Sequence, residues 1–277
     1  MSAGAAELAF LALAVLLLGT PHGALDGREA RVWLRPKLGS SWAAPFVAGY
    51  LGLAAATLLL WFAAPLLALA AFLTLSVWHF GSHDSPSRGP VPVLVRGSIP
   101  PVLAAAAHPT ETGALFTLLA GEGGDATAAL LGGPLLLLWL AGAAATLLLE
   151  RGAAARAELL LLAALFVLAP PLIAFALYFG LLHSPRALAA SRRPGESWAA
   201  MLRAALPWSL AAVALALPLW LLFRPELGEG PALVRTLFWW LSALTVPHMA
   251  LHWLSRRTSP TAAARSWQGS PSPAKAG

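Results

Sequence analysis

Long apolar runs, separated by short polar segments, make up most of this chain. A helix that spans a bilayer needs about 20 mainly apolar residues, and stretches of that length recur along the sequence. Backbone polar groups in lipid must be satisfied within the helix, and no alternation of apolar and polar residues favours a barrel. The pattern therefore predicts an all-α, polytopic transmembrane helical bundle. Its seven predicted spans are residues 6–25, 43–62, 64–82, 128–149, 158–182, 205–223 and 232–255.

Two apolar segments interrupt this pattern with prolines. Residues 99–120 open with Pro100 and Pro101 and carry polar residues in their middle. We expect this segment to be re-entrant, to lie at the interface or to form a weak eighth span. The adjacent Pro170 and Pro171 predict a kink or break inside the fifth span, because proline lacks the amide hydrogen that a helix interior uses.

The composition excludes several classes of protein. Hydrophobic residues are 58% and charged residues 11% of the chain, whereas an ordinary soluble domain is about 45–50% apolar and about 25% charged. A soluble enzyme, a disordered chain and a nucleic-acid binder are excluded, and the expected partner is the lipid bilayer. We expect one integral membrane domain over 1–257 and a disordered cytoplasmic tail over 258–277, which is rich in Ser, Pro and Ala.

The distribution of basic residues predicts the orientation of the bundle. Cytoplasmic loops carry an excess of Lys and Arg. With seven spans and the basic segment 28–37 in the cytoplasm, 4 of the 18 basic residues fall outside; with eight spans, 8 of 18 do. The first span lacks the basic leader of a signal peptide. These observations favour seven spans in a plasma membrane, with the N-terminus outside and the C-terminus inside.

Five of the seven histidines end the odd-numbered spans. Odd-numbered spans run in the same direction, so these histidines are expected at the same depth near the cytoplasmic face. Neutral imidazole is the commonest metal ligand, ionisable residues within a membrane are costly, and the chain has no cysteine. The sequence therefore predicts a metal site. Its candidate ligands are His22, His79, His183, His248 and His252.

The spacing of the remaining polar residues adds detail to this site. His248 and His252 are four residues apart and share one helix face. Asp26 and Asp84 follow His22 and His79 by four and five residues. Carboxylates commonly bind the second nitrogen of a metal-ligating imidazole, so both aspartates are expected in the second shell of the site.

Other interpretations of the histidines stay open. His83 is interpreted as a loop residue, and His108 is left unassigned because a re-entrant segment could carry it inward or leave it in water. A single histidine at a helix end is commonly an interfacial anchor or a partner of the helix dipole. Paired histidines also fit a haem- or quinone-linked redox protein or a transporter with intramembrane histidines.

Four short motifs resemble those of a known family. These motifs lie in the predicted order along almost the whole chain: Pro21-His22-Gly23-Ala24-Leu25-Asp26, His79-Phe80-Gly81 with Asp84, Tyr178-Phe179 with His183-Ser184 and Arg186, and Pro247-His248. They are similar to the motifs of the Brp/Blh family of membrane β-carotene 15,15′-dioxygenases.

This resemblance implies an enzyme that uses Fe²⁺ and O₂ to cleave the central 15,15′ double bond of β-carotene. The product would be two molecules of retinal, destined for a microbial rhodopsin. His22, His79 and His183 match the family's ligand motifs. Family members often carry a further histidine where this chain has Ala187, and one after the first motif where it has Gly27. We therefore expect His248, together with His252, to complete the metal site.

Overall fold

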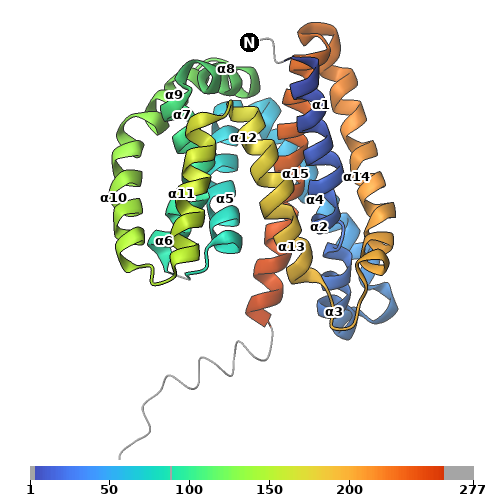
Figure 1. Ribbon diagram of the computed structural model, residues 1–277. Coiled ribbons are helices and arrows are strands. Elements are labelled where there is room, and N and C mark those ends of the chain that lie inside the picture. Colours follow the sequence, from blue (N-terminus) through green and yellow to red (C-terminus); the bar gives the residue numbers. More distant parts are fainter. Residues whose placement is uncertain (1–3, 88, 259–277) are drawn as a thin grey trace, which may run out of the picture.

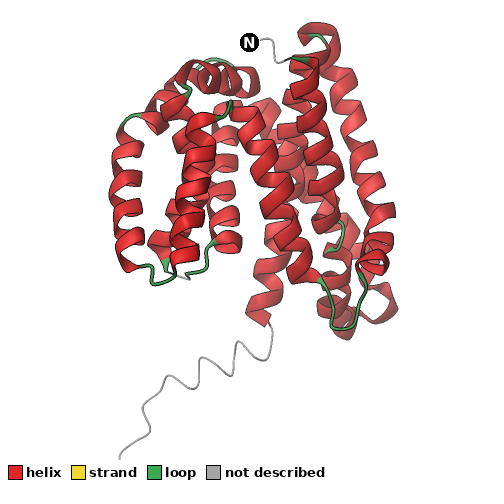
Figure 2. Ribbon diagram, in the orientation of Figure 1, coloured by secondary structure: helices red, strands yellow, loops and turns green. Residues whose placement is uncertain are grey.

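Helices account for nearly all of the described chain (Figure 2). The computed structural model describes residues 4–87 and 89–258, and this part contains no strand. The predicted all-α polytopic bundle is confirmed. By length and composition, six helices in the described part can cross a membrane: 26–63, 65–84, 90–107, 124–149, 171–191 and 198–227.

The first three predicted spans form helices close to their expected bounds. The first is one continuous helix made of α1 (Ala5–Leu13), the π-helical η1 (Ala14–Gly19) and α2 (Thr20–Gly23). The basic segment that follows is helical rather than a loop. The next elements are α3 (Asp26–Leu38), η2 (Gly39–Trp42), α4 (Ala43–Ala63) and α5 (Pro65–Asp84).

The weak segment 99–120 is divided between two structures. Its first part belongs to an 18-residue helical run, 90–107, that is apolar enough to cross. This run consists of α6 (Pro90–Ser98), the π-helical η3 (Ile99–Leu103) and α7 (Ala104–Ala107). Its second part is α8 (Pro109–Ala120), which lies across the upper end of the bundle in Figure 1. By length and composition, the first part of the segment fits the alternative of a weak additional span, and the segment as a whole is not a single helix.

The predicted span 158–182 is wrong as a single helix. It divides into α11 (Ala153–Leu168) and α12 (Pro171–Leu177). The expected break occurs at Pro170, where the backbone is extended with ψ 144°, and the chain reverses direction (Figure 1). The neighbouring elements are α9 (Gly124–Gly132), α10 (Pro134–Leu149), the π-helical η4 (Tyr178–His183) and α13 (Ser184–Ser191).

Two 30-residue helices complete the described bundle. They are α14 (Trp198–Leu227) and α15 (Glu229–Thr258), which contain the last two predicted spans. α15 packs against α4, α14 and α3. Beyond Thr258, the predicted tail lies outside the described residues.

Glycines bring α5 and α6 into backbone contact. A Cβ added at Gly81 would lie 1.9 Å from the carbonyl oxygen of Val93, and one added at Gly97 would lie 1.8 Å from that of Val77. Small residues allow helices in a membrane to approach this closely. Gly81 follows His79 by two residues, so this packing fixes the part of α5 that carries the predicted ligand.

Candidate metal centre

Three histidines from distant parts of the chain meet inside the bundle. His79 lies on α5, His183 ends η4 and His248 lies on α15, and all three are buried. The Nε2 atoms of His79 and His183 are 3.2 Å apart. The ring centroids of His79 and His248 are 5.3 Å apart. His79 is therefore the ring that both of the others approach.

Asp84 fixes the orientation of His183. Its Oδ2 lies 3.0 Å from His183 Nδ1 and accepts a hydrogen bond of 2.6 Å from the hydroxyl of Tyr178. A carboxylate acceptor at Nδ1 favours the tautomer with the proton on that nitrogen, which leaves the Nε2 lone pair for a metal. In the structure, this Nε2 faces His79.

Asp26 holds His248 in the same manner. Its Oδ1 and Oδ2 atoms lie 2.8 and 2.9 Å from His248 Nδ1. The hydroxyl of Tyr50 donates a hydrogen bond of 3.1 Å to Asp26 Oδ2. The chain contains only two tyrosines, and each binds one of these two aspartates. Two Tyr–Asp–His arms thus converge on His79.

His83 belongs to the histidine cluster, so its interpretation as a loop residue was wrong. It lies in the last turn of α5, and its ring centroid is 4.9 Å from that of His79. His79, His83 and His248 each offer one ligand atom, and these atoms lie within 4.8 Å of one another. The four-residue spacing between His79 and His83, equal to that between His248 and His252, was the signal that could have identified it.

His252 lies one turn beyond His248 and contacts two acidic residues. Its Nδ1 is 2.7 Å from Glu29 Oε2, and its Nε2 is 3.7 Å from Asp26 Oδ1. Asp26, His248 and His252 form a second group whose ligand atoms lie within 4.8 Å. Glu29 also accepts a hydrogen bond from Ser255. No motif or spacing in the sequence indicated a role for Glu29.

The other two histidines differ in where the structure places them. His22 lies in α2, but its side chain is outside the described part of the structure. Thr20 and Gly23, on either side of it, line the cavity described next. His108 precedes α8 at the opposite end of the bundle (Figure 1). Its Nδ1 lies 4.0 Å from Glu111 Oε2, and it is not part of the histidine cluster around His79.

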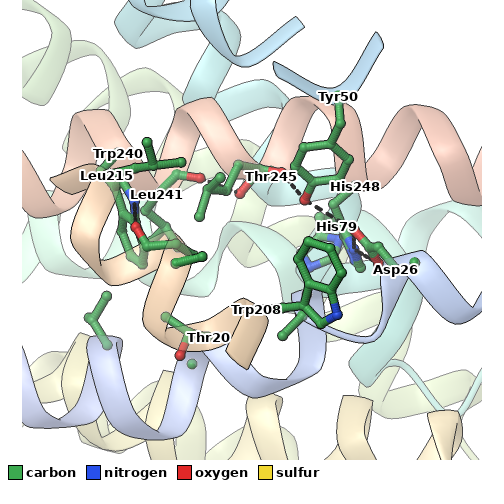
Figure 3. A pocket seen from close by; sticks show the side chains of 18 of the residues that line it. Thr20, Asp26, Tyr50, His79, Trp208, Leu215, Trp240, Leu241, Thr245 and His248 are labelled. Atoms are coloured by element: carbon green, nitrogen blue, oxygen red, sulfur yellow. Dashed lines mark hydrogen bonds and ion pairs between the residues drawn. The ribbon is translucent and has the colours of Figure 1, made fainter. Parts of the chain in front are cut away.

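An apolar cavity of about 310 Å³ begins at the histidines. Figure 3 shows Asp26, His79 and His248 at one end of this cavity and Leu215 and Trp240 at the other. Aliphatic and aromatic side chains from α4, α5, α14 and α15 form most of the wall. We call it the main apolar cavity. Its shape and lining suit an elongated apolar molecule.

A polar cavity of about 290 Å³ lies on the other side of the Asp26–His248 pair, which lines both cavities. Its wall includes Glu29, His83 and His252. Ala187, at the position where the related motif often has a histidine, also lines it. A histidine at position 187 would therefore line the same cavity as His83 and His252, one helical turn beyond the three buried rings.

The arginine of the third motif has a structural partner. Arg186 forms two hydrogen bonds, of 2.8 and 2.6 Å, to the carboxylate of Glu158 on α11. The buried Arg96 lies 3.4 Å from the same carboxylate. Paired contacts between arginine and a carboxylate are strong and directional. They join α13, immediately after His183, to α11 and α6.

The donor set fits a first-row transition metal. His79 lies against both His183 and His248, and carboxylates hold the latter two imidazoles at Nδ1. Nitrogen ligands of this kind suit iron, zinc and copper. Three or four imidazoles would also leave coordination positions open to a small molecule.

Comparisons with known proteins agree with this geometry. A family model described as beta-carotene 15,15′-dioxygenase matches residues 13–255. A curated relative, the beta-carotene 15,15′-dioxygenase of the uncultured marine bacterium 66A03, is 28% identical over 246 residues, covering 86% of this chain and 90% of the relative. No solved structure matches. The family match covers the three buried histidines and both Tyr–Asp–His arms, and the chain belongs to the beta-carotene 15,15′-dioxygenase family.

Proposed function

We propose that this protein cleaves the central 15,15′ double bond of β-carotene with O₂ and releases two molecules of retinal. The observation that carries this proposal is that His79 and His248 line one end of the main apolar cavity, with His183 directly against His79. A polyene in that cavity would lie beside the atoms best suited to hold a metal.

Fe²⁺ is the proposed cofactor, and His79, His183 and His248 are its proposed ligands. His22 joins them by its place in the first motif, next to cavity-lining residues on α2. His252 is a further candidate ligand, because it forms a group with Asp26 and His248. When bound, the metal would supply the site at which O₂ is activated for attack on the double bond.

The protein contributes orientation and charge. Asp84 accepts a hydrogen bond from Nδ1 of His183, and Asp26 accepts one from Nδ1 of His248. These bonds leave Nε2 of each ring for the proposed metal. Tyr178 and Tyr50 in turn hold the two carboxylates by donating hydrogen bonds. Imidazole ligands would add no charge of their own, and the two aspartates would balance the charge of a divalent metal, which limits the cost of placing it inside a membrane.

The main apolar cavity positions the substrate. Trp240 and His248 are eight residues apart on α15, which corresponds to about 12 Å along a helix. Apolar walls of that depth hold one arm of a polyene while keeping its reacting bond near the histidines. A substrate that partitions into lipid reaches such a cavity without passing through water, and the walls exclude water from the reacting bond.

The membrane-spanning helices support a cellular setting in a bilayer. We place the protein in the plasma membrane as a single catalytic domain over 1–257, with the histidine end of the bundle toward the cytoplasm. Retinal released into the bilayer would be available to a microbial rhodopsin in the same membrane.

Expression in bacteria that accumulate β-carotene tests the proposal. We expect cells to lose their orange colour and to produce about two retinals for each carotene consumed. His79→Ala should abolish this conversion. His108→Ala is the matched control, because it removes a histidine at the other end of the bundle and should leave conversion unchanged. Unchanged carotene in cells that contain well-folded wild-type protein would contradict the proposed function.

A further inference from the structure

A second apolar cavity, of about 70 Å³, meets the main apolar cavity along α5. Its wall comes from α5, η3, α7, α8, α11, α12 and α15, and its lining includes Ala104, Thr112 and Phe175. It shares Phe72, Ser76 and Phe80 with the main apolar cavity. We call it the second apolar cavity.

The shared residues place the junction of the two cavities beside the metal centre. Phe72, Ser76 and Phe80 are spaced four residues apart, so they follow one face of α5. His79 lies three residues after Ser76, within one turn of the same helix. The narrowest of the three side chains, Ser76, is therefore close to the ring on which both Tyr–Asp–His arms converge.

The irregular helices of the bundle border these cavities. Each of the three π-helical segments in the described residues contributes to a wall: Gly19 of η1 and Phe179 of η4 line the main cavity, and Pro100 and Pro101 of η3 line the second. Short π-helical segments occur frequently at functional sites. The second cavity thus has the same kind of backbone irregularity as the cavity that reaches the histidines.

Packing considerations also distinguish the second cavity from a defect. Voids larger than a water molecule are few in protein interiors, because the groups that line them lose contacts. A void with apolar walls stays dry and is able to bind an apolar ligand. A dry void that opens beside the metal centre is consequently suited to an apolar part of the substrate.

We propose that the second apolar cavity receives the second arm of the substrate, so that the polyene passes over the face of α5 that carries Phe72, Ser76 and Phe80, with its central bond beside His79. This inference rests on the proposed function. The first arm occupies the main apolar cavity, and the ring of the half-buried Phe72 turns to admit the second arm past Ser76. The smaller cavity then determines which second arms are accepted, and the meeting point of the two arms determines which bond is cleaved.

Filling the second cavity tests this assignment. Ala104→Phe places a ring in its wall, away from the histidines. The matched control is Ala107→Phe on the same short helix, where the native side chain is exposed. Each variant is assayed with β-carotene and with a β-apocarotenal that keeps one ring and the central double bond but ends short of the second ring.

We expect Ala104→Phe to lower kcat/KM for β-carotene at least about tenfold relative to the shortened substrate, since small changes in an apolar pocket discriminate by about 10–200-fold. Ala107→Phe should leave the ratio of the two kcat/KM values unchanged. Ala104→Leu, a smaller change, keeps the test available if the phenylalanine variant fails to fold, and should shift the ratio in the same direction.

Equal effects on the two substrates, or no effect on either in folded protein, would overturn the two-arm assignment while leaving carotenoid cleavage intact. If the wild-type protein cleaves neither substrate, the proposed function itself fails. The two failures are therefore distinguished by the wild-type rates.

Discussion

The two Tyr–Asp–His arms use the same hydrogen bonds in different surroundings. In the arm of Tyr178, Asp84 and His183, the histidine side chain is 0% exposed and the aspartate 2%. Phe80 and Phe179 cover the imidazole, with ring centroids 4.7 and 5.7 Å from that of His183. This enclosed arm has no polar cavity on either side of its Asp–His pair among the cavities described above.

The arm of Tyr50, Asp26 and His248 separates two cavities instead. Asp26 and His248 line both the main apolar cavity and the polar cavity, and Tyr50 lines the former. The comparison shows that one hydrogen-bond pattern serves two purposes. Packing fixes the enclosed arm, which would anchor the proposed metal site, whereas the cavity arm separates the main apolar cavity from the polar cavity.

Removal of the ring common to both arms should have the largest effect. His79→Ala deletes the imidazole that approaches both His183 and His248. We expect loss of bound iron and of carotene cleavage to background, measured by metal analysis and by retinal formation. A folded variant that keeps the wild-type iron content would show that His79 is not a ligand.

Asp84→Asn should weaken the enclosed arm strongly. Loss of a carboxylate that orients a ligating histidine typically lowers metal affinity or activity by about 10–100-fold. The amide keeps one acceptor oxygen for the buried His183 but carries no charge, and the weaker hydrogen bond should cost about 1–2 kcal/mol of unfolding free energy. Iron release to a chelator and thermal unfolding in detergent measure the two effects. Wild-type values in both would contradict the anchoring role.

Asp26→Asn should show how the two arms differ in their contribution to stability. We expect a loss of metal affinity within the same range of about 10–100-fold. The loss of stability should be smaller than for Asp84→Asn, because Asp26 and His248 border a polar cavity where water is able to replace the lost hydrogen bonds. The same chelator and unfolding measurements apply. Equal or greater destabilisation than in Asp84→Asn would remove the distinction between the arms.

Replacement of the tyrosines should lower the unfolding free energy least, and the loss should again be larger in the enclosed arm than in the cavity arm. Tyr178→Phe removes a buried donor to Asp84 and should lower stability by about 1 kcal/mol. Tyr50→Phe removes a longer hydrogen bond, 3.1 Å against 2.6 Å, at a cavity wall, and should cost less. Paired unfolding curves of the two variants test the order, and a larger loss in Tyr50→Phe would reverse it.

The sequence predicted the level of the histidines correctly despite two local errors in topology. The favoured seven-span topology did not count 90–107, which is long and apolar enough to cross, and it treated 158–182 as one span although the chain reverses at Pro170. Each error reverses the expected direction of every later helix. The second error restores what the first reversed, so the helices after Pro170 run in the predicted direction. His183 and His248 therefore reach the same end of the bundle as His79, as the charge distribution had indicated.

The partners within the cluster could not be predicted from spacing. The sequence placed Asp26 and Asp84 in the site because they follow His22 and His79 closely. In the structure, Asp26 binds His248, 222 residues away, and Asp84 binds His183, 99 residues away. Pairings of this kind depend on helix packing, which local periodicity does not contain.

The other residues of the site differed in whether the sequence contained a signal that could predict them. His83 had a detectable signal in its four-residue spacing from His79. Tyr50 and Glu29 had none, because each lies in a helix whose neighbours are set by tertiary contacts with α15. The glycine of the second motif, Gly81, has a packing role that becomes evident only from the 1.9 Å approach of the Val93 carbonyl.

Iron content measured alongside cleavage tests the central claim most directly. Purified protein is depleted with a chelator, reloaded anaerobically with Fe²⁺ and assayed for retinal from β-carotene. We expect about one iron per chain in the wild type, cleavage in proportion to bound iron, and neither in His79→Ala or His183→Ala. Undiminished cleavage by metal-depleted protein, or full iron binding by both folded variants, would contradict a metal centre built from these histidines.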